Sequence, residues 1–165
     1  MLVAAMVALT LASQTFSDGG MLPSSAEYNG SGCSGKNIQP ELHWSGAPAG
    51  TLSFAITIHD PDASAPGGWW HLVVFDIPAG LKSFGPMMQN AMTSQSFIYG
   101  TTSFGSRGYG GPCPPLGATH HYVFTLYALD TKLRADGSTT GPQLLKLMES
   151  HVLAKVSITA LYGRS

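Results

Sequence analysis

Four segments of the chain are patterned like β-strands. In Leu52–Ile58 and in Lys155–Tyr162 large apolar residues alternate with lysine, serine, threonine or alanine, which is the period of two expected for strands. Tyr122–Leu129 is largely apolar at both sets of positions, as in a strand buried on two sides. Trp70–Ile77 is a run of aromatic and β-branched residues closed by a Pro-Ala-Gly turn. The pattern therefore predicts at least four strands.

One segment carries the signals of an α-helix. Thr140 and Gln143 have the spacing of a capping box, and Pro142 falls in the first turn. A broad apolar stripe of leucine, methionine and valine follows, and it predicts a helix over Gln143–Leu153. Four strand patterns against one helix indicate a mostly β domain with a helix near its C-terminal end.

The stretch Pro78–Gly117 is unusual because it contains eight glycines and five prolines. Loops of this length inside a compact domain are usually functional or disordered. Five aromatic residues are spread along the stretch, and they favour an ordered loop that packs against the domain.

The N-terminal pattern allows two interpretations. Leu2–Leu11 is apolar apart from one threonine, like the core of a secretory signal, but no lysine or arginine precedes Lys36. Alternation over Val7–Ala12 predicts a first strand instead. The two interpretations are compatible if about five residues left from a signal peptide precede the strand. We expect residues 1–7 to be a signal-peptide remnant or a disordered start, and residues 8–165 to form one domain without a membrane-spanning run.

Composition and charge narrow the class of partner. The 165 residues suit one domain, and only 10% of them are charged, against about 25% in an average domain. Eight Lys and Arg against nine Asp and Glu give a formal charge of −1, with no basic stripe or tail. Nucleic acid is therefore not an expected partner, nor is electrostatic docking on a membrane.

The two cysteines are Cys33 and Cys113, 80 positions apart and outside any Cys-x-x-Cys pair. They are either two unrelated buried thiols or a disulfide. Both lie in glycine-rich segments that read as surface loops, beside a candidate signal remnant. This context favours a disulfide and a periplasmic or secreted location, with the cytoplasm as the alternative.

Histidine and aspartate gather at the ends of the predicted strands. Asp60 follows the first strand, His71 opens the second and His120 opens the third, just after the segment Gly108–Pro115. If these strands are neighbours in one sheet, the three ends can meet in one pocket that grips an anion or a polar head group. Glycines in the segment would let backbone N–H groups approach a ligand, and prolines would fix the wall. Taken singly, each motif is more often structural than functional.

These motifs together resemble the phosphatidylethanolamine-binding protein family, also called Raf kinase inhibitor-like proteins, in its bacterial branch. The likeness runs from about Leu9 to Gly163. It rests on ordered motifs along the chain: Leu11–Ser13, Asp18–Gly20, Asn37–Pro40, Trp44-Ser45, Pro48–Thr51, Asp60–Ala63, Gly68–His71 with Val73-Val74, Gly108–Pro115 and Gly117–Tyr122.

The resemblance implies a large central antiparallel sheet with Greek-key connections, a smaller second sheet and a few helices. It also implies a small cavity for phosphate-like anions such as a phospholipid head group. Three departures bear on affinity: Ser64 replaces a proline, His121 replaces an arginine, and Pro66–Gly68 lacks a pocket tyrosine that eukaryotic members have. The residues that the resemblance places in the cavity are Asp60, His71, Gly111, Pro112, Pro114, His120 and Tyr122.

The expected function is that of a binding module for a small anionic or phosphorylated ligand, without catalysis, cofactor or metal. Asp60 would orient and charge either His71 or His120, and Tyr122 with backbone N–H groups near Gly111 would complete the donors. Inhibition of a kinase or protease is an alternative, and a metal- or acid/base-dependent esterase is a weaker one, since no Gly-x-Ser-x-Gly or His-Glu-x-x-His motif is present. A homodimer stays an open alternative.

Overall fold

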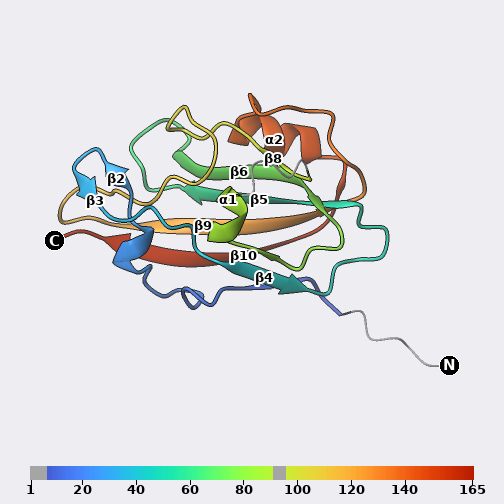
Figure 1. Cartoon of the computed structure of the whole chain (residues 1–165), viewed down its shortest axis with the longest axis horizontal. Coiled ribbons are helices and arrows are strands. Elements are labelled where there is room, and N and C mark those ends of the chain that lie inside the picture. Colours follow the sequence, from blue (N-terminus) through green and yellow to red (C-terminus); the bar gives the residue numbers. More distant parts are fainter. Residues whose placement is uncertain (1–6, 91–95) are drawn as a thin grey trace.

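The centre of the computed structural model, which describes residues 7–90 and 96–165, is a five-stranded antiparallel sheet (Figure 1). Its order is β10-β9-β5-β6-β8. Within this sheet, β5, β6 and β8 lie side by side in chain order, and β9 returns to pair with β5, which is the strand order of a Greek key. The strands are β5 (Ser53–Asp60), β6 (Trp69–Pro78), β8 (Ile98–Tyr99), β9 (Thr119–Leu129) and β10 (Val152–Gly163).

A smaller sheet covers one face of the large one. Its three antiparallel strands have the order β1-β4-β7, and a separate hairpin, β2–β3, lies at one end of the molecule (Figure 1). The remaining elements are β1 (Thr10–Ala12), η1 (Ser24–Ala26), β2 (Asn29–Gly30), β3 (Cys33–Ser34), β4 (Leu42–Ser45), β7 (Ser83–Phe84), α1 (Pro86–Asn90) and α2 (Gly141–Met148).

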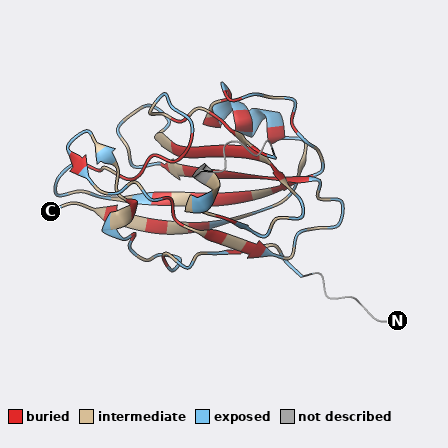
Figure 2. Ribbon diagram, viewed as in Figure 1, coloured by how far each residue is buried: buried red, intermediate tan, exposed pale blue. Residues whose placement is uncertain are grey.

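The large sheet is buried on both faces in its middle (Figure 2). Towards the small sheet, Phe54, Ile56 and Leu126 belong to the main apolar core. On the opposite face a second core forms around Phe75 and the α2 residue Leu144. Covering both faces explains why β5 and the middle parts of β6 and β9 are buried at nearly every position, whichever face a side chain points to. The predicted mostly β fold, with a large sheet, smaller sheets and few helices, is confirmed.

Two predicted boundaries were wrong. The helix ends at Met148 rather than at Leu153, because the last residues of the apolar stripe begin β10, where Val152 pairs with Leu129. The stretch Pro78–Gly117 is not one loop, since it contains β7, α1 and β8. The expected packing of its aromatic residues is correct for Phe84, Phe97, Tyr99 and Tyr109, which are buried.

At the N-terminal end, alternation predicted a strand over Val7–Ala12, and the strand β1 covers only Thr10–Ala12. The predicted signal remnant falls almost entirely on residues 1–6, which lie outside the described residues. Within the described part of the chain, no helix has the length and apolar character needed to cross a bilayer.

Candidate functional site

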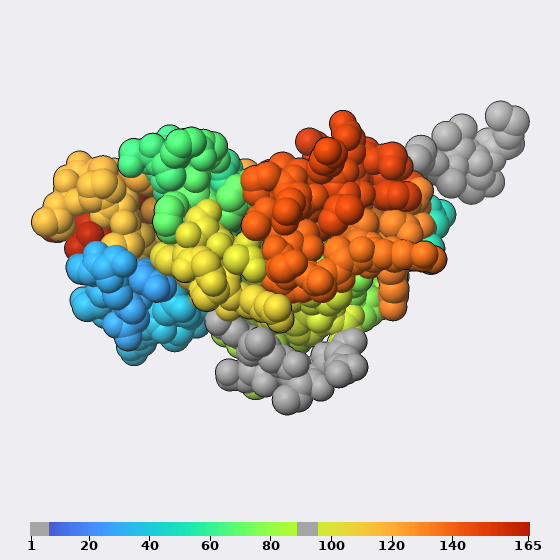
Figure 3. Space-filling view, turned by 90° about the horizontal axis from the view of Figure 1, so that it is seen from above, coloured from blue at the N-terminus to red at the C-terminus, as the bar shows by residue number. Residues whose placement is uncertain are grey.

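A cavity of about 430 Å³ opens at one end of the large sheet. Because β5 is antiparallel to both β6 and β9, the end of β5 lies beside the beginnings of its two neighbours, as the strand-end motifs predicted. In the space-filling view the segments that surround the cavity gather at the left end of the molecule (Figure 3). The lining residues are Tyr28, Ser31, Asp60, Asp62, Ala63, Ser64, Trp69, His71, Phe104, Cys113, Pro114, Pro115, His120 and Tyr122.

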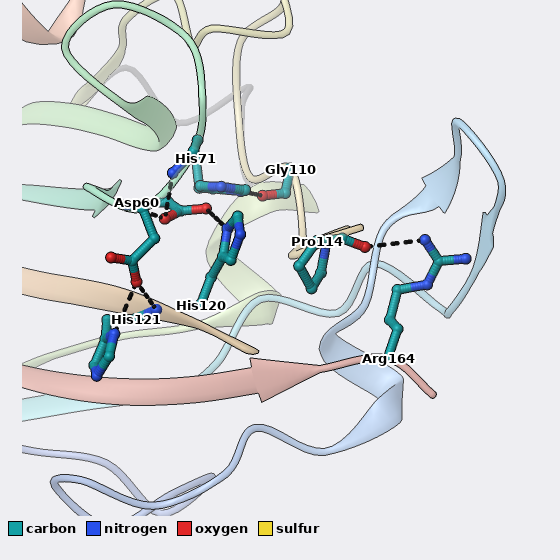
Figure 4. Close-up of polar contacts among 9 residues, drawn as sticks. Asp60, His71, Gly110, Pro114, His120, His121 and Arg164 are labelled. Atoms are coloured by element: carbon teal, nitrogen blue, oxygen red, sulfur yellow. Dashed lines mark hydrogen bonds and ion pairs between the residues drawn. The ribbon is translucent and has the colours of Figure 1, made fainter. Parts of the chain in front are cut away.

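Asp60 is the buried acid of the cavity, with only 3% of its surface exposed. Its Oδ1 accepts the backbone N–H groups of Asp62 at 2.8 Å and Ala63 at 3.2 Å, which is the turn that an Asp-Pro-Asp sequence favours. Its Oδ2 lies 2.7 Å from His120 Nδ1 (Figure 4). The carboxylate therefore fixes the His120 ring and takes the hydrogen on Nδ1, which leaves Nε2 for a ligand.

His71 is held differently. It sits at an irregularity between β5 and β6, where Ile58 pairs with Leu72 but His59 pairs with Trp70, so His71 is the extra residue of a β-bulge. Bulges re-aim side chains next to binding sites. Here the His71 Nδ1 lies 2.7 Å from the carbonyl oxygen of Gly110 and donates its hydrogen there (Figure 4). Of the two histidines considered for pairing with Asp60, the structure selects His120.

Burial keeps the His71 ring uncharged. Loss of solvent lowers the pKa of His71 to about 4, and this outweighs the Gly110 carbonyl and the Asp60 carboxylate, which act in the opposite direction. At neutral pH the ring therefore carries one hydrogen, on Nδ1, and Nε2 has a free lone pair. The two cavity histidines thus have separate roles: His120 faces a carboxylate, and His71 is neutral.

The predicted wall residues divide into two groups. Pro114 lines the cavity, and so does Tyr122, whose phenol is buried and whose pKa is raised, chiefly by that burial. Gly111 and Pro112 are not among the lining residues. The Gly111 N–H donates to the side-chain oxygen of Asn37 at 2.7 Å, so this N–H is not free for a ligand. A Cβ at Gly111 would lie 2.1 Å from a backbone oxygen, which gives this glycine a packing role.

The predicted disulfide between Cys33 and Cys113 is present, and it builds one side of the cavity. The β2–β3 hairpin turns through Ser31 and Gly32, which both have positive φ, as a two-residue hairpin turn requires. Because of this turn, Ser31 lines the cavity and Cys33 lies where it bonds to Cys113. Arg164 stabilises the same side, since its guanidinium donates to the carbonyl oxygens of Gly32 and Pro114, the residues next to the two cysteines.

Several lining residues were missed from the sequence. Tyr28 and Phe104 stack with ring centroids 4.6 Å apart and form an aromatic wall, although 76 positions separate them. Tyr28 brings a phenol to the cavity from a different part of the chain than the missing tyrosine near Pro66. At the rim, His121 Nδ1 pairs with Asp62 Oδ2 at 2.7 Å, in the position where the family arginine was expected. Tyr28 lies outside the sequence motifs named above, and Phe104 was counted only among the five aromatic residues of the Pro78–Gly117 stretch.

Comparison with known proteins agrees with this architecture. The model of the family described as phosphatidylethanolamine-binding protein matches residues 12–163. The chain belongs to the phosphatidylethanolamine-binding protein family. It is 38% identical over 158 residues to the Escherichia coli protein YbhB, covering 94% of this chain and 100% of YbhB. It is also 37% identical over 161 residues to YbcL of the same organism, covering 94% and 87%.

Solved structures give the same result. The crystal structure of E. coli YbcL, described as a new member of the mammalian family, superposes with a TM-score of 0.90 at 35% identity, covering 96% of this chain and all of that one. The homologue CT736 from Chlamydia trachomatis gives a TM-score of 0.82 at 30% identity, with coverage of 96% and 99%. The resemblance read from the sequence motifs is confirmed at the level of family and fold.

The site offers polar recognition but no evident metal cage. Within residues 7–90 and 96–165, no group of three or more His, Cys, Asp or Glu side chains is arranged to hold a metal ion. This member of the phosphatidylethanolamine-binding protein family has a cavity with aromatic and proline walls. Its polar lining includes the carboxylates of Asp60 and Asp62, two differently held imidazoles and the phenols of Tyr28 and Tyr122. Such a set can bind and orient a small polar ligand.

Proposed function

We propose that this protein is a binding module for a small anion of the phosphate type, carried either by a free phosphorylated compound or by a phospholipid head group. The observation that carries the proposal is the Asp60–His120 pair inside the cavity, at 2.7 Å. A carboxylate alone would repel an anion in such a sheltered place. Its Oδ2 is instead engaged by His120, and the second nitrogen of that ring is left for the ligand.

Two further groups support anion binding. The Tyr122 hydroxyl makes no hydrogen bond to any described residue, and burial keeps the phenol protonated, so it is an available donor. The aromatic wall and Pro114 exclude water from the other side of the ligand. A few polar groups that converge in an otherwise apolar cavity are the usual composition of a small-molecule site.

We propose binding without a chemical step. An acid–base hydrolase of this kind would need a nucleophile beside the histidine. No Ser or Thr hydroxyl among residues 7–90 and 96–165 hydrogen-bonds to His120, and the Cys113 sulfur that lines the cavity is committed to the disulfide. Within residues 7–90 and 96–165, we identify no surface that specifically favours binding to a kinase or a protease.

We also propose an extracytoplasmic location. The disulfide supports it, because such bonds persist in oxidising compartments. A Mycobacterium tuberculosis relative, named as a candidate lipoprotein, LppC, is 39% identical over 136 residues, covering 82% of this chain and 62% of that protein. Accessibility of the native protein to a membrane-impermeant reagent in intact cells, compared with a cytoplasmic control protein, tests the location.

Calorimetric titration with phosphoethanolamine tests the function. His120→Ala should weaken binding by about 1.5–3 kcal/mol, as expected for a lost hydrogen bond to a charged group. His151→Ala is the matched control, because His151 forms a similar pair with Asp130, at 2.8 Å, outside the cavity. Equal affinities of wild type and His120→Ala would exclude this cavity as the binding site.

A further inference from the structure

The cavity contains an acceptor that an ordinary anion site would not have. The Nδ1 hydrogen of His71 is donated to the Gly110 carbonyl oxygen, so the tautomer is fixed and Nε2 carries the lone pair. Nε2 makes no hydrogen bond to any described residue. His71 is only 4% exposed, but its Nε2 is not one of the described side-chain polar atoms that are fully buried without a partner. The small exposed part of the side chain therefore includes Nε2. Since His71 lines the cavity, Nε2 faces the space where a ligand would lie.

The buried carboxylate of the cavity is already in use. Both oxygens of Asp60 accept hydrogen bonds, one from two backbone N–H groups and the other from His120. Asp62 is more exposed, and its Oδ2 accepts from the backbone N–H and the ring of His121. His71 Nε2 is therefore a buried acceptor at which a ligand has to supply a hydrogen.

We propose that this cavity selects anions that carry a proton on one of their own oxygens, with His71 as the residue that accepts this hydrogen bond. The monoanion of a phosphomonoester has a P–OH group and meets this requirement. A phosphodiester and sulfate have no such proton on their oxygens. The inference rests on the proposed function, and it narrows the ligand class to phosphomonoesters or inorganic phosphate.

The preference for protonated anions arises because an anion without a proton leaves His71 Nε2 without a hydrogen bond. An anion without a proton would point an oxygen lone pair at the lone pair of Nε2, in a place that water reaches poorly. A buried acceptor left without its hydrogen bond loses about 1–3 kcal/mol, which corresponds to about 5- to 150-fold in affinity. Sites built around a buried polar group reject a ligand that lacks the matching group more strongly than apolar pockets reject a change of size.

The groups around His71 support its neutral state. Asp60 and His59 lie on β5, and His120 and Tyr122 lie on β9, while Phe104 and Tyr122 contact the ring edge to face. Asp60 favours protonation and His59 opposes it, but burial dominates and lowers the pKa of His71 to about 4. The ring is therefore an acceptor across the physiological range, and it becomes a donor only in strong acid.

Charge-matched probes test the proposal. At about pH 5.5 methyl phosphate is mostly a monoanion with a P–OH group, since the second phosphate pKa is near 6. Dimethyl phosphate has the same charge and no such group. We expect methyl phosphate to bind at least about tenfold more tightly than dimethyl phosphate or sulfate. Glycerophosphoethanolamine, a diester with an ammonium group, separates the two ligand sources: tight binding equal to methyl phosphate would favour a lipid head group and overturn the restriction to monoesters.

The outcomes separate the two proposals. If none of the anions binds, the proposed function fails. If methyl phosphate and dimethyl phosphate bind equally, the function stands and the selection by His71 is wrong. His71→Gln should reduce the preference towards one, because its amide can turn either an oxygen or an NH₂ group to the ligand. His120→Ala should weaken both probes and keep their ratio.

A spectroscopic measurement on the unaltered protein covers the case in which His71→Gln does not fold. The ¹⁵N resonances of the His71 ring should show a neutral ring with hydrogen on Nδ1 at about pH 5.5. The Nε2 resonance should move on addition of methyl phosphate and stay in place on addition of dimethyl phosphate. A protonated ring, or an Nε2 resonance that ignores both probes, would overturn the assignment.

Discussion

The double variant Cys33→Ser/Cys113→Ser lacks the disulfide. Its free energy of unfolding should be lower by most of the amount that a disulfide closing a long loop contributes. The two cysteines are 80 positions apart, and the loop between them includes β4, β5, β6 and β7. The chain-entropy relation for a loop of this length gives about 4.5 kcal/mol at 25 °C. This figure is a ceiling, because measured disulfide contributions are typically about 2–4 kcal/mol.

Noncovalent contacts around the disulfide also hold this part of the structure, and they bear on how much stability the variant loses. Arg164 donates to the Gly32 carbonyl oxygen at 2.7 Å and to the Pro114 carbonyl oxygen at 3.1 Å, so it links the hairpin and the cavity wall without the covalent bond. The Tyr28 N–H donates to the Pro112 carbonyl oxygen at 3.0 Å and adds a second link. The native arrangement should therefore survive the substitution, and the loss should come mainly from the unfolded state.

Guanidinium unfolding of the oxidised protein and of the double serine variant measures the effect. We expect a difference of about 2–4 kcal/mol, with a melting temperature lower by about 4–16 °C for a chain of this size. Thiol titration of the unfolded, unreduced protein should find no free thiol. Two free thiols, or a stability difference below about 1 kcal/mol, would refute the reasoning.

Three further substitutions test the packing and the rim. Gly111→Ala should destabilise by more than about 1 kcal/mol, since its Cβ would meet a backbone oxygen at 2.1 Å, and thermal unfolding measures this. Leu144→Ala should lose about 2–5 kcal/mol from the second core, whereas Leu145→Ala, 38% exposed, should stay within about 0.5 kcal/mol. His121→Ala should change stability by less than about 1 kcal/mol. The backbone N–H of His121, and after it the ring, lower the pKa of Asp62, and the variant loses only the contribution of the ring. That contribution exists above the ordinary pKa of Asp and disappears as pH falls through the lowered pKa of Asp62.

The fold was largely predictable because its strands obey local rules. Leu52–Ile58 was predicted and Ser53–Asp60 is observed, since alternation and turn residues mark both ends. The helix boundary was wrong for a physical reason: Val152, which opens β10, lies four positions after Met148 and so continues the helical spacing of the apolar stripe. Pairing of Val152 with Leu129 in the sheet decides the conformation there, and a single sequence does not display that pairing.

The cavity was predictable in its outline but not in its hydrogen bonds. Strand ends brought Asp60, His71 and His120 together as the motifs indicated. The sequence does not reveal that a bulge at His71 turns its ring towards the Gly110 carbonyl oxygen, which leaves His120 to pair with Asp60. The occupied N–H of Gly111 was missed for the same reason, since its partner is the side chain of Asn37, 74 positions away. Hydrogen bonds of this range depend on the tertiary structure.

The different holding of the two histidines also explains how a cavity with a buried carboxylate can suit an anion. If Asp60 contacted both rings, its charge would favour protonation of both, and the cavity would attract any anion without discrimination. Because the Gly110 carbonyl oxygen occupies His71 instead, only His120 pairs with the carboxylate, and His71 keeps a free acceptor. In the proposed function, attraction of the anion and selection among anions are then separate properties, the first assigned to His120 and the second to His71. Variants of these two residues should therefore affect affinity and preference independently.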